Sequence, residues 1–133
     1  MSNVSAMIGV AQMEHLPSII ARYQENGLYY DEKLADVPGV TIIRRPPNSR
    51  SAYWVYTFLV RERDRLFKRL REEGVQSSKV HLRNDLYAAF GNRAESLPGV
   101  ELFSNNCLSI PSGWWVTKND RVRIADMICQ EAQ

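Results

Sequence analysis

Residues 51–60, SAYWVYTFLV, decide the fold, because this stretch is the densest in aromatic and β-branched side chains. Residues of this kind favour a half-buried β-strand. In a strand, Trp54, Tyr56 and Phe58 have the same parity and would line one face of a sheet. That face could serve as a stacking platform for RNA or could pack beneath a helix, and we favour packing in the core.

The segments on either side of this strand alternate between helix and strand patterns. Residues 64–73 are expected to form a helix that carries Leu66, Phe67 and Leu70 on one face and ends at Gly74. Further strands are expected at residues 40–44, 75–82 and 107–110, and turns at residues 37–39 and 97–99.

The last helix has its own start signal. Thr117 is followed three residues later by Asp120, which is a capping-box pattern, so we expect a helix over residues 117–130. Val122, Ala125 and Ile128 are expected to face inward from it.

The first segment, residues 4–36, has apolar side chains at helical spacing. Pro17 interrupts this helix, because proline lacks an N–H and its ring clashes with the carbonyl of Met13. An unbroken helix of this length would measure about 50 Å, whereas a compact globule of this size is about 36 Å across. The helix must therefore bend near Pro17, or its first part must project from the domain.

Together these elements predict a single α/β (α+β) domain over residues 1–133, with a long helix at residues 1–36 and a small α/β unit at residues 37–133. We expect a small, mainly antiparallel sheet around residues 51–60, covered by the helices at 64–73 and 117–130. A chain of this length can bury roughly two-thirds of its unfolded surface, which is enough for a core without disulfide staples.

Composition excludes several classes of protein. A net charge of +2 argues against a nucleic-acid partner, and the interleaved signs in residues 61–73 indicate a solvated helix face. No apolar run approaches the ~20 residues that cross a bilayer, and the start lacks a signal-peptide pattern. We therefore expect a cytoplasmic protein with no membrane partner. No metal site is expected either, because the candidate ligands are scattered: His15, His81, Cys107 and Cys129.

Two short segments carry candidate site residues. His81, Arg83, Asn84 and Asp85 follow an expected strand, where they could bind an anion or could form a hydrogen-bonded turn that caps a short helix near Leu86. The second segment is S-G-W-W at residues 112–115. Because adjacent side chains point to opposite sides, we expect one tryptophan to be buried and the other to face a cleft.

In their order and spacing, the stretches at residues 1–16, 22–34, 63–75, 80–87 and 110–115 resemble the DegT/DnrJ/EryC1/StrS family, the pyridoxal-phosphate-dependent aminotransferases that act on nucleotide-linked keto-sugars. Residues 1–16, MSNVSAMIGVAQMEHL, are similar to that family's helix of form M-S-x-x-x-A-x-x-G-x-x-Q-L-x-x-L. Residues 22–34 and 63–75 are similar to its next two motifs. VHLRNDLY at 80–87 and IPSGWW at 110–115 resemble a bacterial subgroup tied to lipopolysaccharide sugar biosynthesis.

This resemblance implies the C-terminal small domain of a fold-type I aminotransferase. The family's aldimine lysine lies in the large N-terminal domain, and none of the four lysines here sits in a family-like S-x-x-x-K context: Lys33, Lys68, Lys79 and Lys118. We therefore expect no catalytic or cofactor-binding residue in this chain, although the parent family uses pyridoxal phosphate. One hypothesis is a truncated or partial chain, inactive alone. The other is a stand-alone interaction or ligand-binding module, so whether the chain is an enzyme stays open.

The resemblance and the apolar pattern also imply partners. A sugar-nucleotide or another anion would meet His81, Arg83 and Asn84, with Trp114 or Trp115 nearby and Arg83 acting as a bidentate fork. The helix at residues 4–16 has apolar residues on more than one face, which predicts a homodimer through this helix.

Overall fold

A computed structural model describes residues 2–80, 82–91 and 96–132 of the chain. The described residues form five α-helices and a three-stranded antiparallel sheet, which confirms the predicted fold class. In chain order the elements are α1 (Asn3–Met13), α2 (Leu16–Leu34), β1 (Val40–Ile42), β2 (Tyr56–Val60), α3 (Arg63–Glu72), α4 (Pro98–Asn106), β3 (Cys107–Ile110) and α5 (Lys118–Glu131), with short 3-10 turns at Asn84–Leu86 and Ala88–Phe90 between α3 and α4.

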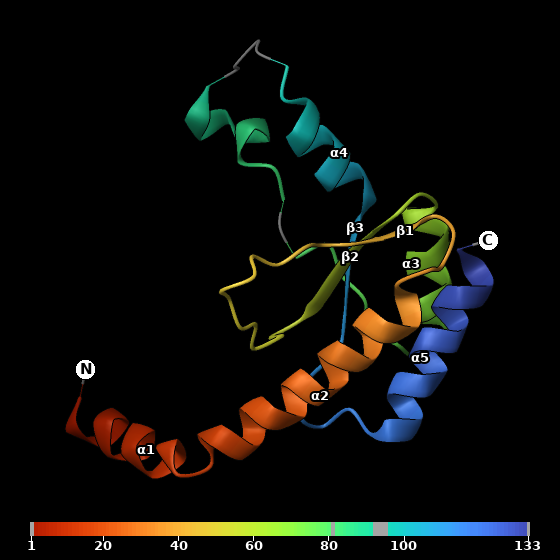
Figure 1. Cartoon of the computed structure of the whole chain (residues 1–133). Helices are drawn as coiled ribbons and strands as arrows, with labels where there is room; N and C mark the ends of the chain where they lie inside the picture. The colour runs from red at the N-terminus through yellow and green to blue at the C-terminus, as the bar shows by residue number, and fades with distance from the viewer. Residues whose placement is uncertain (1, 81, 92–95, 133) are drawn as a thin grey trace.

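The core lies between the sheet and three helices. The strand order is β1-β2-β3, with Val40 opposite Val60 and Tyr56 opposite Ile110. Alternate β2 residues are buried, as expected for a strand with one face on the core. Helices α2, α3 and α5 cover that face (Figure 1). Its largest buried side chains are Tyr30, Leu34, Tyr56, Phe58, Leu66, Leu70, Leu108, Ile110 and Ile128.

Only the second half of residues 51–60 forms a strand, so part of the central prediction is wrong. Tyr53 has φ +50°, a left-handed conformation that is rare for a side chain of this size, and it stops the pleat before β2 begins. Trp54 therefore does not share the face of Tyr56 and Phe58, and its side chain is 68% exposed. Tyr53 is buried in its place, at 7% exposure.

The first segment consists of two helices, with the break at Glu14 and His15. Pro17 does not bend a continuous helix but lies in the first turn of α2, where its missing N–H costs no hydrogen bond. Both expected consequences occur together, because the helix is interrupted and α1 also projects from the body (Figure 1). None of the residues of α1 is buried.

Three further local predictions need correction. Residues 75–82 form no strand in their described part, apart from a single bridge between Ser78 and Ser109. The segment at 97–99 does not make an isolated turn, because Pro98 starts α4. The capping box of Thr117 and Asp120 is confirmed at the start of α5, but Val122 is exposed, while Ile124 and Met127 are buried with Ala125 and Ile128.

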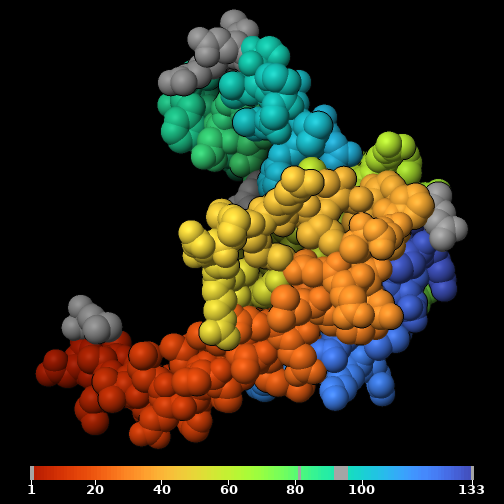
Figure 2. All heavy atoms as spheres, in the orientation of Figure 1, coloured from red at the N-terminus to blue at the C-terminus, as the bar shows by residue number. Residues whose placement is uncertain are grey.

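Two projections give the molecule its shape. The arm, which we define as described residues 82–91 and 96–106, rises from one end of the sheet, and α1 extends at the opposite end (Figure 1). Figure 2 shows that the surface on this side recedes between the arm and α1. The segment around residue 50 lies in this region. Among the described residues, no helix is long and apolar enough to cross a membrane.

Candidate functional site

The arm holds two of the predicted site residues, Arg83 and Asn84, while His81 lies outside the described residues. The Arg83 guanidinium faces the Asp85 carboxylate in a bidentate pair, at 3.0 Å from Nε and 2.6 Å from Nη2, and it lies 3.8 Å from Glu101 of α4. The hydrogen bond and charge of Asp85 raise the pKa of Arg83. The fork that was expected to hold an anion is therefore occupied by the protein's own carboxylate.

Asn84 takes part in this turn through its backbone. Its carbonyl accepts a hydrogen bond from the N–H of Tyr87 at 3.1 Å, and its side chain is exposed. Neither the Asn84 nor the Asp85 side chain caps the 3-10 turn. Of the two alternatives, the geometry of residues 83–87 thus agrees with a hydrogen-bonded turn. The ion pair between Arg83 and Asp85 stabilises this turn.

The structure does not bring Trp114 to this turn. The arm ends where β3 begins, and the S-G-W-W loop follows the other end of β3, so the two segments lie at opposite ends of that strand (Figure 1). The expectation that one tryptophan is buried is also wrong, because Trp114 is 53% exposed and Trp115 59%. Their rings meet edge to face, with centroids 5.9 Å apart.

A different pair of tryptophans, Trp54 and Trp115, borders a hollow of about 300 Å³. We call it the Trp54–Trp115 hollow. Its apolar lining includes Val55, Val80 and Ile110. Sequence reasoning missed Trp54, because its parity placed it in the core, and no local pattern indicates the left-handed turn at the residue before it.

A buried network fixes the loop that carries Trp115. Asn26 of α2 is 2% exposed, and its amide donates to the carbonyls of Gly113, Val116 and Ser112 at 2.9, 3.3 and 3.4 Å. Its side-chain oxygen accepts from Arg121 at 3.0 Å. Buried carbonyls that are satisfied in this way are costly to release, so the loop has one well-defined conformation.

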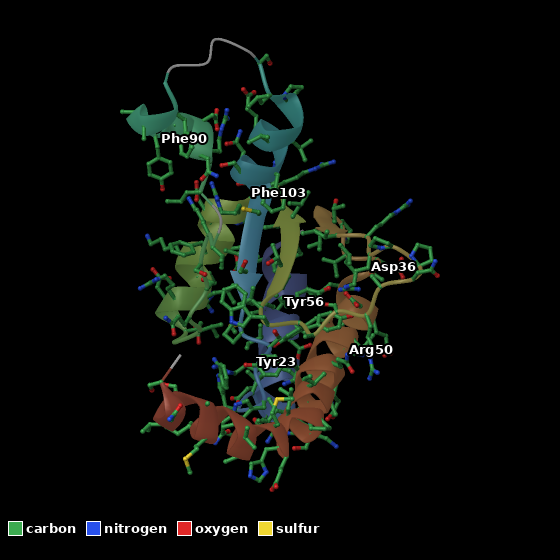
Figure 3. All side chains as sticks on the ribbon, turned by 90° about the vertical axis from the view of Figure 1, so that its left-hand side faces the viewer. Tyr23, Asp36, Arg50, Tyr56, Phe90 and Phe103 are labelled. Atoms are coloured by element: carbon green, nitrogen blue, oxygen red, sulfur yellow. The ribbon has the colours of Figure 1, made fainter. Side chains whose placement is uncertain are left out.

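A second cluster, centred on Asp31 of α2, fixes the turn that carries Trp54. The Asp31 carboxylate accepts hydrogen bonds from Arg45 at 2.7 and 2.9 Å, from Tyr53 at 2.6 Å and from Tyr56 at 2.8 Å. Tyr56 lies near the centre of the molecule, against α2 (Figure 3), with its ring centroid 5.1 Å from that of Tyr30.

The titration of this cluster follows from its contacts. Burial raises the pKa of Asp31, but the hydrogen bonds from Arg45, Tyr53 and Tyr56 outweigh it and hold the pKa below its ordinary value. Burial and the hydrogen bond to Asp31 raise the pKa of Tyr53 to about 12, and the same causes raise the pKa of Tyr56. At neutral pH the cluster is one carboxylate held by one cation and two neutral phenols.

None of the four lysines lies in an environment that would activate its amine. Lys33 is exposed on α2 with its ammonium over the Tyr29 ring, and Lys118 is exposed at the start of α5. Lys68 lies 3.9 Å from Glu72, and Lys79 lies 3.0 Å from Asp64. A nucleophilic lysine needs desolvation or a neighbouring cation. Three of these lysines are exposed, and Lys79 contacts a carboxylate rather than a cation. The surroundings of these four lysines therefore do not suit a Schiff base with the aldehyde of a cofactor.

The described residues thus form a small α+β unit with a hollow of about 300 Å³ beside its last strand, β3. Comparison with known families assigns the chain to one of them. The model of the DegT/DnrJ/EryC1/StrS aminotransferase family matches residues 1–129. The chain belongs to this family.

Individual relatives support the assignment and show how much of them the chain represents. It is 30% identical over 118 residues to the erythromycin biosynthesis sensory transduction protein EryC1 of Saccharopolyspora erythraea, covering 85% of this chain and 32% of the relative. It is 26% identical over 127 residues to a dTDP-3-amino-3,4,6-trideoxy-alpha-D-glucose transaminase of Streptomyces venezuelae, covering 92% and 33%. The crystal structure of the sugar aminotransferase CalS13 from Micromonospora echinospora superposes with a TM-score of 0.88 at 31% identity, covering 93% of this chain and 34% of that one. The chain thus spans about a third of the length of these relatives.

Proposed function

We propose that this chain is the C-terminal small domain of a pyridoxal-phosphate-dependent nucleotide-sugar aminotransferase, and that it supplies part of the substrate side of the site but not the aldimine lysine. The observation that carries this proposal is the position of the four lysines: three are exposed, and Lys79 is paired with Asp64. In this proposal the reactive lysine and the cofactor belong to residues outside the matched third, and this chain binds and orients the sugar-nucleotide.

The finer parts of the proposal come from the names of relatives and from two motifs. The Streptomyces venezuelae relative is named as a transaminase of a dTDP-linked sugar, which supports a nucleotide-linked substrate. The VHLRNDLY and IPSGWW motifs support a role in lipopolysaccharide or other cell-surface sugar biosynthesis. A cytoplasmic location is part of the same proposal.

A second candidate function is a stand-alone dimeric interaction module derived from this fold. One observation favours it: the five large apolar side chains of α1 are 60–74% exposed, and α1 has no buried residue. Contiguous exposed apolar surface on this scale is typical of an interface. The two candidates share the fold and differ in whether the chain acts within a larger enzyme.

A turnover assay tests the first proposal. The purified chain is incubated with pyridoxal phosphate, L-glutamate and a dTDP-linked keto-sugar, with the intact sugar aminotransferase CalS13 as positive control. We expect no amino-sugar product from the chain above the rate without protein. Turnover that one Lys→Arg substitution abolishes would contradict the proposal, because a catalytic lysine would then lie in this chain.

A further inference from the structure

We propose that the Trp54–Trp115 hollow is a binding site for an uncharged nucleobase. The proposal rests on the proposed function only in the choice of thymine as the base to test. Everything else follows from two exposed aromatic planes, the contacts that hold them in place and the chemistry of the surface between them.

Trp54 and Trp115 present a large aromatic surface to solvent. Each is more than half exposed, although a tryptophan side chain gains free energy from burial. Both border the same hollow, one from the turn before β2 and the other from the loop after β3. Paired aromatic planes beside a hollow are the usual means of stacking a flat ring.

The backbone at Tyr53 directs Trp54 outward and is held in a strained conformation. The left-handed φ of +50° is costly for a non-glycine residue and persists only where the surroundings impose it. Ser51 Oγ accepts from the Tyr53 N–H at 3.0 Å, Ser112 Oγ donates to its carbonyl at 2.6 Å, and Arg45 lies 4.4 Å from the centroid of its ring. Strain of this kind is concentrated at functional sites, and here its effect is to expose a tryptophan that a regular strand would bury.

Contacts within the protein also hold the Trp115 ring in place. The Trp115 ring packs so closely on Gly113 that a Cβ added there would lie 2.4 Å from it, and its edge faces Tyr23 with centroids 6.0 Å apart. The Asn26 hydrogen bonds hold the same loop from beneath. Because the Trp115 ring and the backbone turn that carries Trp54 are held before the ligand arrives, less entropy is lost on binding.

The lining of the hollow selects an uncharged ligand. Every described residue that lines it is uncharged, and its polar members are three serines and Gln76. Ser109 and Ser112 already hydrogen-bond within the protein, to Thr57 and to the Tyr53 carbonyl. The Gln76 amide and the Ser78 hydroxyl are exposed and can pair with the donors and acceptors on the edge of a base.

The size and surroundings of the hollow agree with the base of a nucleotide rather than the whole molecule. About 300 Å³ is at the lower end of the range for small-ligand sites, which suits one ring system. Phosphates would remain outside, since none of the described lining residues is a cation. Val55 also lines a neighbouring hollow that contains Arg45, Arg50 and two serines, which places positive charge next to the base site.

The test is a titration of the folded chain with thymidine, which carries the base without a phosphate. Saturation-transfer NMR detects contact with the thymine ring, and tryptophan fluorescence gives the Kd. Trp54→Ala and Trp115→Ala are compared with Phe90→Ala, a control in which an aromatic side chain of similar exposure (61%) that does not line the hollow is removed. Circular dichroism confirms that each variant is folded.

We expect thymidine to bind the wild type and the Phe90→Ala variant alike, and to bind the Trp54→Ala and Trp115→Ala variants about 5- to 150-fold more weakly, as lost base stacking requires. Absence of transfer to thymine at millimolar thymidine would overturn the proposal. Binding of dTDP alone, lost in Arg50→Ala but kept in Trp54→Ala, would indicate a phosphate site and overturn it as well. Competition by methyl glucoside would assign the hollow to a sugar ring instead. A cofactor-binding lysine in this chain would contradict the proposed function without changing any of these outcomes.

Discussion

Asp31 connects three segments through a single carboxylate. Arg45, Tyr53 and Tyr56 all donate to it, and they belong to the loop after β1, the strained turn and the first residue of β2. Because its side chain is only 20% exposed, the loss of its charge would leave three donors poorly satisfied. At the scale of single residues, this carboxylate determines where Trp54 points.

The first prediction concerns this carboxylate. Asp31→Asn should lower the free energy of unfolding by about 2 kcal/mol at pH 7, the usual value of hydrogen bonds to a charged group. Since the folded-state pKa of Asp31 lies below its ordinary 3.8, its contribution is present above about pH 4 and is lost as the pH falls through the folded value. Urea unfolding at pH 7 and at pH 3 measures the difference, which should shrink in acid.

Asp36→Asn provides the control, because Asp36 is exposed and no ion pair is found for it among the described residues (Figure 3). It should change the free energy of unfolding by less than about 0.5 kcal/mol. Equal effects of the two substitutions at pH 7 would mean that the Asp31 cluster does not stabilise the fold.

At the scale of elements, α2 organises the domain because it packs on both the sheet and α5. Gly27, in the middle of α2, allows this contact. A Cβ added there would lie 2.1 Å from the Tyr53 ring, so glycine is required by close approach rather than by backbone conformation. Gly9 in α1 has no neighbour within 4 Å of such a Cβ.

The second prediction compares these two glycines. Gly→Ala in a helix ordinarily stabilises by up to about 1 kcal/mol. Gly9→Ala should follow this rule and raise the helical circular dichroism signal. Gly27→Ala should instead lower the free energy of unfolding by about 1–3 kcal/mol, because the Tyr53 ring must move. Chemical denaturation measures both, and a stabilising Gly27→Ala would show that α2 and the Tyr53 turn do not pack as described.

Elements that depend on local signals could be predicted from the sequence. Helix α3 followed its apolar spacing and Gly74, α5 followed the capping box at Thr117, and β3 was predicted with its observed bounds. The turn at Tyr53 could not be predicted, since its causes are Asp31 and Ser112, which are 22 and 59 residues away. The same limit applies to the site: Trp115 lay in a recognised motif, whereas Trp54 depends on that turn.

At the scale of the whole molecule, α1 stands out because its large apolar side chains are exposed and none of its residues is buried. Val4, Met7, Ile8 and Ala11 lie within about 100° of one another around the helix, and Val10 and Met13 lie on another side. Burial of the three larger side chains of the first group, at about 1.5–3 kcal/mol each, contributes roughly 4.5–9 kcal/mol before entropy is counted. A two-fold dimer would cover the first group on both copies.

The third prediction is that the wild-type chain is a dimer and that Ile8→Glu with Leu16→Glu gives a folded monomer. Burying two charges in an apolar interface is costly enough to dissociate it. Sedimentation velocity at high micromolar concentration measures the mass. Gln130→Glu adds a charge to an exposed position of α5, away from α1, and should leave the dimer intact. A wild-type chain that sediments as a monomer would contradict self-association through α1.

We propose that this chain contains no lysine able to hold pyridoxal phosphate, and reductive trapping tests this proposal most directly. The chain is incubated with pyridoxal phosphate and reduced with borohydride, and its intact mass is measured by mass spectrometry. CalS13 serves as the positive control. The surroundings of Lys33, Lys68, Lys79 and Lys118 predict no stoichiometric adduct, only traces spread over several lysines. A single adduct in a one-to-one ratio, located on one lysine and removed by substituting that lysine with arginine, would contradict the claim.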